Sequence, residues 1–174
     1  FTKKMAALRV GDPLDPATDV GPLVNAETRD KVDYFVRDAI EKGAKVKLGG
    51  QRPNGLGFFY PPTVMTSVPD NAKCLSDEIF GPVAAIQTFT DEDEILVRAN
   101  NTEYGLVAYV YTRDMARGLS ISERLDFGMI GLNRGLVSDP AAPFGGVKQS
   151  GLGREGGKEG LLEFQETQYI STAW

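Results

Sequence analysis

The sequence predicts an α/β fold in which a largely parallel sheet is flanked by helices. Short apolar strands alternate with amphipathic helices along most of the 174 residues, and units this short imply right-handed crossovers between parallel strands. Apolar residues make up 41% and charged residues 25% of the chain, ordinary values for a folded globular protein. The length suits one domain, with or without an appendage.

The first predicted helix starts after Asn25, whose side chain is suited to cap it, and runs to about Lys42. Gly43 fits the left-handed position just beyond the end of that helix. Apolar residues recur with helical spacing and form the face that we expect to be buried. This stripe consists of Val32, Phe35, Val36, Ala39 and Ile40.

Five extended segments are predicted, over residues 44–48, 58–65, 83–89, 106–112 and 129–133. Two prolines confine the second segment to a sheet edge or to the start of a strand, because proline lacks a backbone N–H. Thr90, followed by three acids, predicts a helix N-cap, and Asp114 predicts another. We expect the first of these helices to fray at Asn101 and the second to end at Gly128.

The last forty residues have a different character. Residues 134–153 hold two prolines and five glycines without clear periodicity, and a loop of this length within a compact domain is usually functional. Residues 156–164 have a helical pattern, and residues 165–174 alternate as a terminal strand would.

Composition excludes several classes of site. The chain has 19 basic and 24 acidic residues, giving a net charge of −5, so no broad basic face for nucleic acid or anionic lipid is expected. Because there is no histidine, no Ser-His-Asp triad, His–Cys dyad or His-ligated metal site is predicted. The single cysteine excludes internal disulfides and thiolate zinc clusters. No metal site is therefore predicted.

Targeting signals are not evident in the sequence. No apolar run approaches the ~18 residues of a membrane span, and the N-terminus does not resemble a signal peptide. A cytoplasmic location without membrane partners is expected. The first residue is Phe1, which is consistent with a piece of a longer protein.

Two segments follow predicted strands where open α/β sheets place ligands. Residues 77–83 combine two acids, Phe80 and a Gly-Pro turn, so they offer a carboxylate and a ring; the alternative is a solvated acidic turn with Phe80 in the core. In residues 143–156 the glycine density indicates close backbone approach or positive φ. A phosphate cradle is the weaker alternative, since P-loop spacing is absent. Cys74 is interpreted as structural, although a neighbouring lysine would lower its pKa.

Three motifs then identify a family. Residues 78–83 read EIFGPV, residues 128–133 read GMIGLN, and residues 143–156 read PFGGVKQSGLGREG. In this order and spacing they resemble the aldehyde dehydrogenase superfamily, as do residues 10–16 and 21–23. The resemblance covers essentially the whole chain. The segment NRGLVS, over residues 133–138, makes the chain most similar to succinate-semialdehyde dehydrogenases.

The resemblance implies oxidation of an aldehyde to an acid with NAD or NADP. In the family a cysteine thiolate attacks the aldehyde and a glutamate activates the water that hydrolyses the thioester. Both residues are expected upstream of Phe1, so no catalytic residue is assigned here, and Cys74 falls at a non-catalytic position. The chain then corresponds to a partial catalytic domain over residues 1–164 and an oligomerisation strand over residues 165–174. Homo-oligomers formed through that strand are expected.

The same resemblance suggests roles for four residues. Glu78 matches the glutamate that accepts hydrogen bonds from the nicotinamide ribose, and Phe80 matches a ring that packs against the nicotinamide. Phe144 matches an aromatic residue of the aldehyde pocket, and Ser138 matches a serine that binds the carboxylate of succinate semialdehyde. Arg134 is a weaker candidate for that carboxylate. Four further residues are interpreted as structural, namely Asn133, Gly146, Gly151 and Gly153.

Three alternatives stay open. The substrate is succinate semialdehyde, or else glutarate semialdehyde or an uncharged aldehyde, because the main pocket arginines are expected upstream. The isolated chain is alternatively a non-catalytic assembly module. NAD and NADP are not distinguished, since the residues that face the ribose 2′ position belong to the upstream nucleotide-binding domain.

Overall fold

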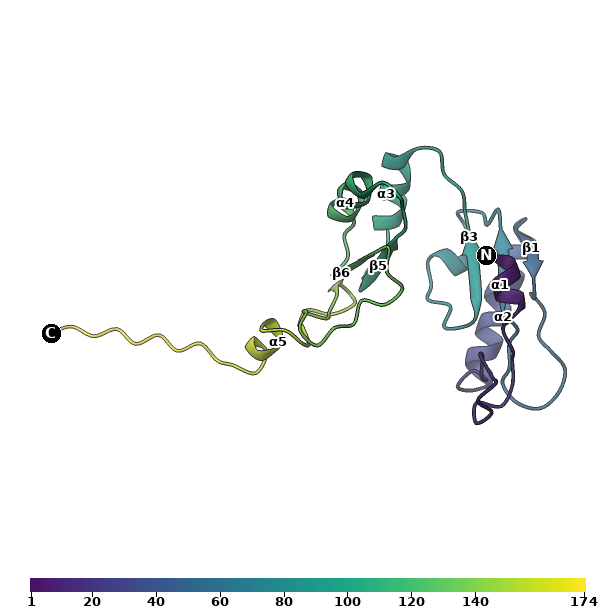
Figure 1. Ribbon diagram of the computed structural model, residues 1–174, viewed down its shortest axis with the longest axis horizontal. Helices are drawn as coiled ribbons and strands as arrows, with labels where there is room; N and C mark the ends of the chain where they lie inside the picture. The colour runs from purple at the N-terminus through teal and green to yellow at the C-terminus, as the bar shows by residue number, and fades with distance from the viewer. The chain divides into compact units, whose positions relative to one another are not determined.

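In the computed structural model, which describes residues 1–174, the chain divides after Thr88 into two units. The first unit holds residues 1–88 and the second holds residues 89–174. Figure 1 draws both, coloured along the chain. The sequence showed no linker at this point, so the division was not predicted.

The first unit contains a three-stranded sheet in the order β1-β2-β3. Its elements are α1 (Thr2–Ala6), α2 (Ala26–Glu41), β1 (Lys45–Leu48), β2 (Thr63–Thr66), the 3₁₀ turn η1 (Lys73–Leu75) and β3 (Val83–Ile86). The pair β1–β2 is antiparallel, whereas β2–β3 is parallel with Thr63 opposite Val83. Since β2 is the central strand, the two prolines before Thr63 lie at a strand start and not on a sheet edge.

Helix α2 provides one face of the core of this unit. Asn25 Oδ1 accepts a hydrogen bond from Thr28 N at 2.8 Å, as the predicted cap requires, and Gly43 has a φ of +109° beyond the helix end. The buried face consists of Val32, Phe35, Val36 and Ala39, which pack with Tyr60, Met65 and Cys74. Ile40 is 39% exposed, so its place in the predicted stripe was wrong: it lies at the edge of the buried face.

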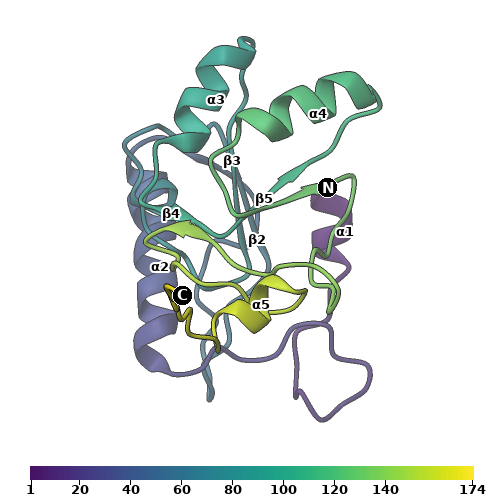
Figure 2. The same ribbon diagram turned by 90° about the vertical axis from the view of Figure 1, so that its left-hand side faces the viewer.

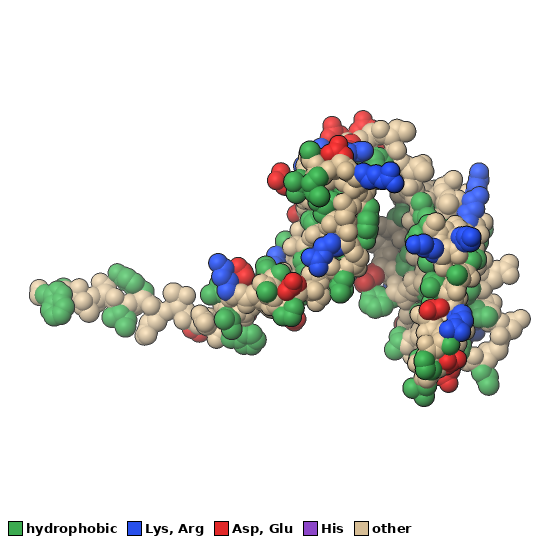
Figure 3. All heavy atoms as spheres, viewed as in Figure 1, with side chains coloured by type: hydrophobic (Ala, Val, Ile, Leu, Met, Phe, Trp, Pro, Cys, Tyr) green, Lys and Arg blue, Asp and Glu red, His purple; other side chains and the backbone are tan.

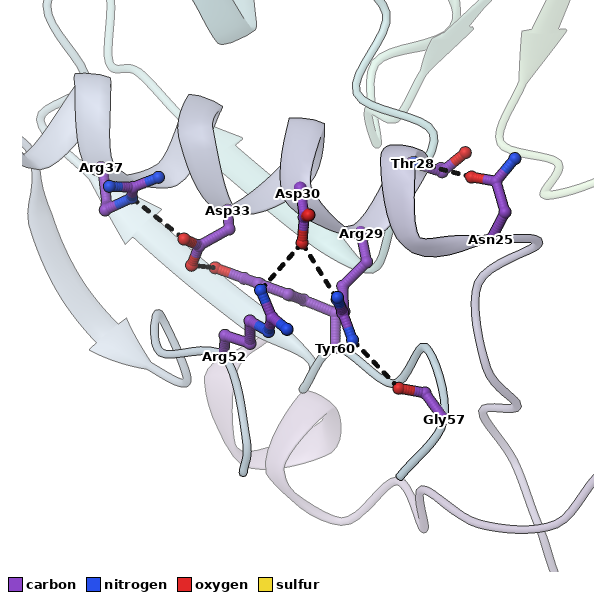
Figure 4. Close-up of polar contacts among 9 residues, drawn as sticks. All are labelled: Asn25, Thr28, Arg29, Asp30, Asp33, Arg37, Arg52, Gly57 and Tyr60. Carbon is purple, nitrogen blue, oxygen red and sulfur yellow. Dashed lines mark hydrogen bonds and ion pairs between the residues drawn. The ribbon is translucent and has the colours of Figure 1, made fainter. Parts of the chain in front are cut away.

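A polar network on α2 fastens the loop before β2 to the helix (Figure 4). Asp30 pairs with Arg29 and with Arg52 from the loop, at 3.1 and 2.9 Å. The Tyr60 hydroxyl donates to Asp33 Oδ1 at 3.3 Å. Burial, with the charge of Asp33 nearby, raises the pKa of Tyr60, so this phenol stays protonated and keeps its donor role.

The second unit contains two separate strand pairs. Its elements are α3 (Glu92–Asn100), β4 (Tyr104–Gly105), β5 (Val107–Val110), α4 (Met115–Arg124), β6 (Met129–Leu132), β7 (Val147–Lys148) and α5 (Glu159–Leu162). The pair β5–β6 is parallel and the pair β4–β7 is antiparallel. The α/β fold class is therefore as predicted, with parallel pairing in β2–β3 and β5–β6 and antiparallel pairing elsewhere.

The helices α3 and α4 lie side by side over one face of the β5–β6 pair (Figures 1 and 2). Asp91, and not the predicted Thr90, caps α3 by accepting from Glu94 N at 2.9 Å. Acidic and basic side chains gather over these two helices (Figure 3), where Glu92 pairs with Arg117 at 2.5 Å. Helix α4 ends at Arg124, four residues before the glycine predicted to end it.

The C-terminal residues 165–174 are exposed and have no regular secondary structure in the single chain. Figure 1 shows this segment in yellow, running out from α5, and Figure 3 shows hydrophobic side chains along it. Tyr169, Ile170 and Trp174 are among them. No partner strand within the chain pairs with the segment, so its role in oligomerisation stays a prediction. Among the helices, none has the length and apolar character needed to cross a bilayer.

Candidate functional site

The first candidate segment is an arch between η1 and β3, made by Glu78, Ile79 and Phe80. Ile79 is partly buried and packs against the core. Phe80 is 69% exposed and has a φ of +51°, a left-handed conformation that is uncommon for a bulky residue. Glu78 is exposed and makes no hydrogen bond or ion pair within the chain. The alternative that placed Phe80 in the core is therefore wrong: a carboxylate and a ring are both offered to solvent.

The chain directly after the arch is fixed to the unit's core. A Cβ at Gly81 would lie 2.6 Å from Val32 Cγ2 of α2, so glycine allows the close approach here. Thr63 N at the start of β2 donates to Pro82 O at 2.8 Å. The Gly-Pro turn thus brings the chain against both α2 and the central strand.

The second candidate segment, residues 143–156, folds back on itself. Phe144 and Glu155 exchange two backbone hydrogen bonds, of 2.7 and 2.8 Å. A Cβ at Gly128 would lie 2.1 Å from Gly145 O, and a Cβ at Gly146 would lie 2.6 Å from Ser150 Cβ. The glycines therefore serve close packing of the chain against itself, which is the favoured interpretation of their density.

The side chain of Arg154 bridges two backbone carbonyls of this loop. Its Nη1 atom donates to Gly146 O at 2.7 Å and to Gly153 O at 2.9 Å. An open groove of about 650 Å³ runs along the loop within the second unit. Phe144 is partly buried and lines this groove, together with apolar side chains such as Leu106, Leu161 and Phe164. Phe144 is thus available to contact an apolar group.

The segment after β6 holds Ser138, which is exposed and makes no hydrogen bond within the chain. Hydrogen bonds hold the start of this segment. Asn133, with a φ of +54°, accepts from Thr112 N at 2.9 Å and donates to Thr112 O at 2.8 Å. Tyr111 Oη donates to Arg134 O at 2.8 Å. The structural interpretation of Asn133 is confirmed, and Arg134 has a backbone role in this segment.

Cys74 is buried as its structural interpretation implies, and one residue of the glycine-rich motif was missed. Cys74 is buried, and this burial raises the pKa of its thiol, so the neighbouring lysine does not activate it. Lys148 was not singled out by the sequence analysis. Its Nζ lies 3.0 Å from Asp126 Oδ2 and donates to Asn100 O, at the end of α3, at 2.9 Å. The only sign of this role in the sequence is that a lysine occurs within the glycine-rich motif.

The predicted site residues thus fall on different units: Glu78 and Phe80 on the first, Ser138 and Phe144 on the second. Residues 1–170 match the family model described as the aldehyde dehydrogenase family. The chain belongs to the aldehyde dehydrogenase family.

Similar members of this aldehyde dehydrogenase family include enzymes for semialdehydes. The chain is 52% identical to a succinate-semialdehyde dehydrogenase of Paenarthrobacter nicotinovorans, over 99% of this chain and 38% of that protein. It is 46% identical to a glutarate-semialdehyde dehydrogenase of Pseudomonas aeruginosa, over 95% of this chain and 34% of the relative. The chain therefore spans little more than a third of the length of these relatives.

The fold is also that of a solved crystal structure. A crystal structure of an NADP-dependent enzyme from E. coli matches 97% of this chain, and 35% of its own, with a TM-score of 0.92 and 43% identity. The match supports the fold of this chain.

Proposed function

We propose that the chain is the C-terminal part of the catalytic domain of an NAD(P)-dependent succinate-semialdehyde dehydrogenase. That enzyme would oxidise succinate semialdehyde to succinate in the cytoplasm. The observation that carries the proposal is the arch of residues 78–80, which presents a carboxylate and an aromatic ring without partners in the chain. The 52% identity to a succinate-semialdehyde dehydrogenase supports the choice of substrate.

The arch has the donor and acceptor chemistry that a nicotinamide nucleoside needs. The two oxygens of Glu78 accept hydrogen bonds from vicinal ribose hydroxyls, and the charge of the carboxylate strengthens these bonds. The exposed ring of Phe80 packs against the flat nicotinamide. When bound, NAD or NADP supplies the hydride acceptor. The role of this chain is to hold and orient that group.

Residues of the second unit are proposed to bind the aldehyde. The Ser138 hydroxyl, which has no partner in the chain, donates to the carboxylate of the substrate. Phe144, on the wall of the groove, packs against the carbon chain next to the aldehyde. The attacking thiolate and the base that activates water are assigned to residues before Phe1, so the 174 residues alone form a non-catalytic assembly module. The tail of residues 165–174 would join copies by strand pairing.

Glutarate semialdehyde is the second candidate substrate. The relative from P. aeruginosa favours it at 46% identity. The two semialdehydes carry the same functional groups and differ by one methylene, so Ser138 would serve both. A methylene in an apolar pocket changes specificity by about 10- to 200-fold.

The experiment uses the full-length protein that contains this chain. Oxidation of both semialdehydes and of an uncharged aldehyde is measured with NAD and with NADP. Glu78→Gln should raise the KM for the cofactor about tenfold, because a charged acceptor of the ribose bonds becomes neutral. Labelling of the active thiol should not change.

Glu41→Gln is the matched control, since Glu41 is another exposed acid of the first unit, at the end of α2. It should leave the cofactor KM unchanged. A wild-type protein without NAD(P)-linked aldehyde oxidation would contradict the proposed function. Equal cofactor KM values for the two variants would contradict the role of Glu78.

A further inference from the structure

We propose that Asp38 of α2 is a positioning residue for the arch of residues 78–80, and thereby sets the affinity for the dinucleotide. The inference rests on the proposed function, because it concerns the same cofactor contacts. Asp38 does not belong to the arch and precedes Glu78 by forty residues. Its effect would be transmitted through the 3₁₀ turn η1.

The carboxylate of Asp38 ties α2 to the segment that leads into η1. Its Oδ2 accepts a hydrogen bond from Lys73 N at 2.9 Å. Its Oδ1 lies 2.7 Å from Lys42 Nζ, and the same ammonium donates to Asn71 O at 2.8 Å. One side chain therefore holds two backbone positions, directly at Lys73 and through Lys42 at Asn71.

The backbone of Lys73 transmits this restraint to the arch. Lys73 O accepts from Ser76 N and Asp77 N, at 3.1 and 3.0 Å, and from Ser76 Oγ at 3.1 Å. Asp38 therefore holds Lys73 by its backbone N–H. The carbonyl of the same residue accepts from the N–H of Asp77, which directly precedes Glu78. Cys74, between them, is buried in the core, which keeps η1 against α2.

A second contact from the same helix fixes the side chain of Lys73. Its Nζ donates to the hydroxyl of Tyr34 and lies 4.8 Å from the centre of that ring. Tyr34 and Asp38 lie four residues apart on one face of α2, and Lys42, the C-cap of this helix, follows at the same spacing. These three side chains contact Lys73 and Asn71 and so hold η1 against α2.

The other end of the arch is fixed independently. Gly81 packs against Val32 of α2, and Pro82 O accepts from Thr63 N. Glu78 itself has no other contact that would hold it. Loss of the Asp38 contacts would weaken the support of the arch at its η1 end, where the burial of Cys74 and the Lys73–Tyr34 contact would remain. Because a binding group that must be ordered on binding loses affinity, the consequence should appear in cofactor affinity.

The test compares Asp38→Asn and Asp38→Ala in the full-length protein. Both should raise the dissociation constant of NADH or NADPH, measured by fluorescence, about tenfold for alanine. Asparagine should have the smaller effect, because its amide oxygen still accepts from Lys73 N. The KM for the aldehyde and thiol labelling should stay close to those of the control.

The control is Asp30→Asn on the same helix. Asp30 has ion pairs with Arg29 and Arg52 but no contact with residues 71–77. The Asp30→Asn variant should bind the cofactor with the same affinity as the wild type. Lys42→Met removes only the link to Asn71 and the partner charge of Asp38, so it tests the same path if Asp38→Ala fails to fold. About a threefold weaker affinity is expected for Lys42→Met.

The outcomes separate the inference from the proposed function. The inference alone would be overturned by the following result. The wild type is active and Glu78→Gln binds the cofactor more weakly, but Asp38→Asn and Lys42→Met bind it as tightly as Asp30→Asn does. An inactive wild type, or a Glu78→Gln variant with normal affinity, would overturn the proposed function. Weakened binding in the Asp38 and Lys42 variants, with normal binding in Asp30→Asn, supports the inference.

Discussion

The packing of the glycine-rich loop depends on the absence of a side chain at Gly128. A Cβ there would lie 2.1 Å from Gly145 O, 2.7 Å from Gly146 Cα and 2.9 Å from the carbonyl carbon of Gly145. All three are backbone atoms, so no side-chain rotation relieves the overlap. The Gly145 carbonyl would have to move about 1.3 Å, the difference between 2.1 Å and the 3.4 Å at which ordinary contact begins.

Two consequences of Gly128→Ala follow from that displacement. Overpacking of this kind typically costs about 1–3 kcal/mol of folding stability. Gly145 directly follows Phe144, which is proposed to contact the aldehyde, and a misplacement of about 1 Å in such a site costs on the order of 100-fold in rate. We therefore expect a lower melting temperature and a roughly 100-fold lower kcat/KM in the full-length enzyme.

The assay measures thermal unfolding and NAD(P)-linked oxidation of succinate semialdehyde. Gly21→Ala is the control, because it adds the same methyl group where the nearest atom, Pro13 Cβ, is 3.6 Å away. It should change neither quantity. If Gly128→Ala keeps its kcat/KM within about twofold of that control, the argument from backbone overlap is wrong.

Three further outcomes are expected. Ser138→Ala should raise the KM for succinate semialdehyde about 10- to 100-fold, since one hydrogen bond to a charged group is lost, and should hardly change the KM for an uncharged aldehyde; equal losses would contradict the role of Ser138. The 174-residue chain alone should show no aldehyde oxidation and should scatter light as dimers or larger assemblies through its exposed tail, whereas a stable monomer at micromolar concentration would refute the association. The hydrogen bond from Lys42, and then that from Lys73 N, lower the pKa of Asp38 in the folded state. The contribution of Asp38 to stability is therefore present above its unfolded pKa, near 3.8, and is lost as the pH falls through the lower folded value. Urea unfolding at pH 7 should therefore give a lower free energy of unfolding for Asp38→Asn than for the wild type. The titratable groups that face Asp38 are Lys42, Lys73 and Cys74. If the two proteins differ as much in free energy of unfolding at acid pH as at pH 7, the stabilising role of the ionised Asp38 is contradicted.

Local signals in the sequence were reliable where one side chain decides the structure. Asn25 and Asp114 were both predicted as helix caps, and each accepts a hydrogen bond from the backbone three residues later. At α3 two neighbouring residues were both able to cap, and Asp91 does so in place of Thr90. The position of a helix start is therefore predictable to within one residue here, because the cap is a short-range interaction.

Long-range features were not predictable in the same way. The contact between Asp38 and Lys73 joins residues 35 positions apart, and nothing in either local segment indicates it. The exposure of Phe80 depends on the left-handed backbone and on Gly81 packing against α2. A bulky aromatic residue in an apolar context reads as core from composition alone. The family motif is what favoured a ligand-binding role for Phe80 over a place in the core, and that role stays a prediction.

The division of the chain after Thr88 has a consequence for how such an enzyme diversifies. The residues proposed to hold the cofactor and those proposed to hold the aldehyde are encoded in successive, separately packed stretches. Selection for a new aldehyde can act on residues 89–174 while the cofactor arch keeps its own supporting helix. Recombination near residue 88 would then exchange the proposed aldehyde contacts of residues 89–174 while leaving the cofactor arch and its supporting helix unchanged.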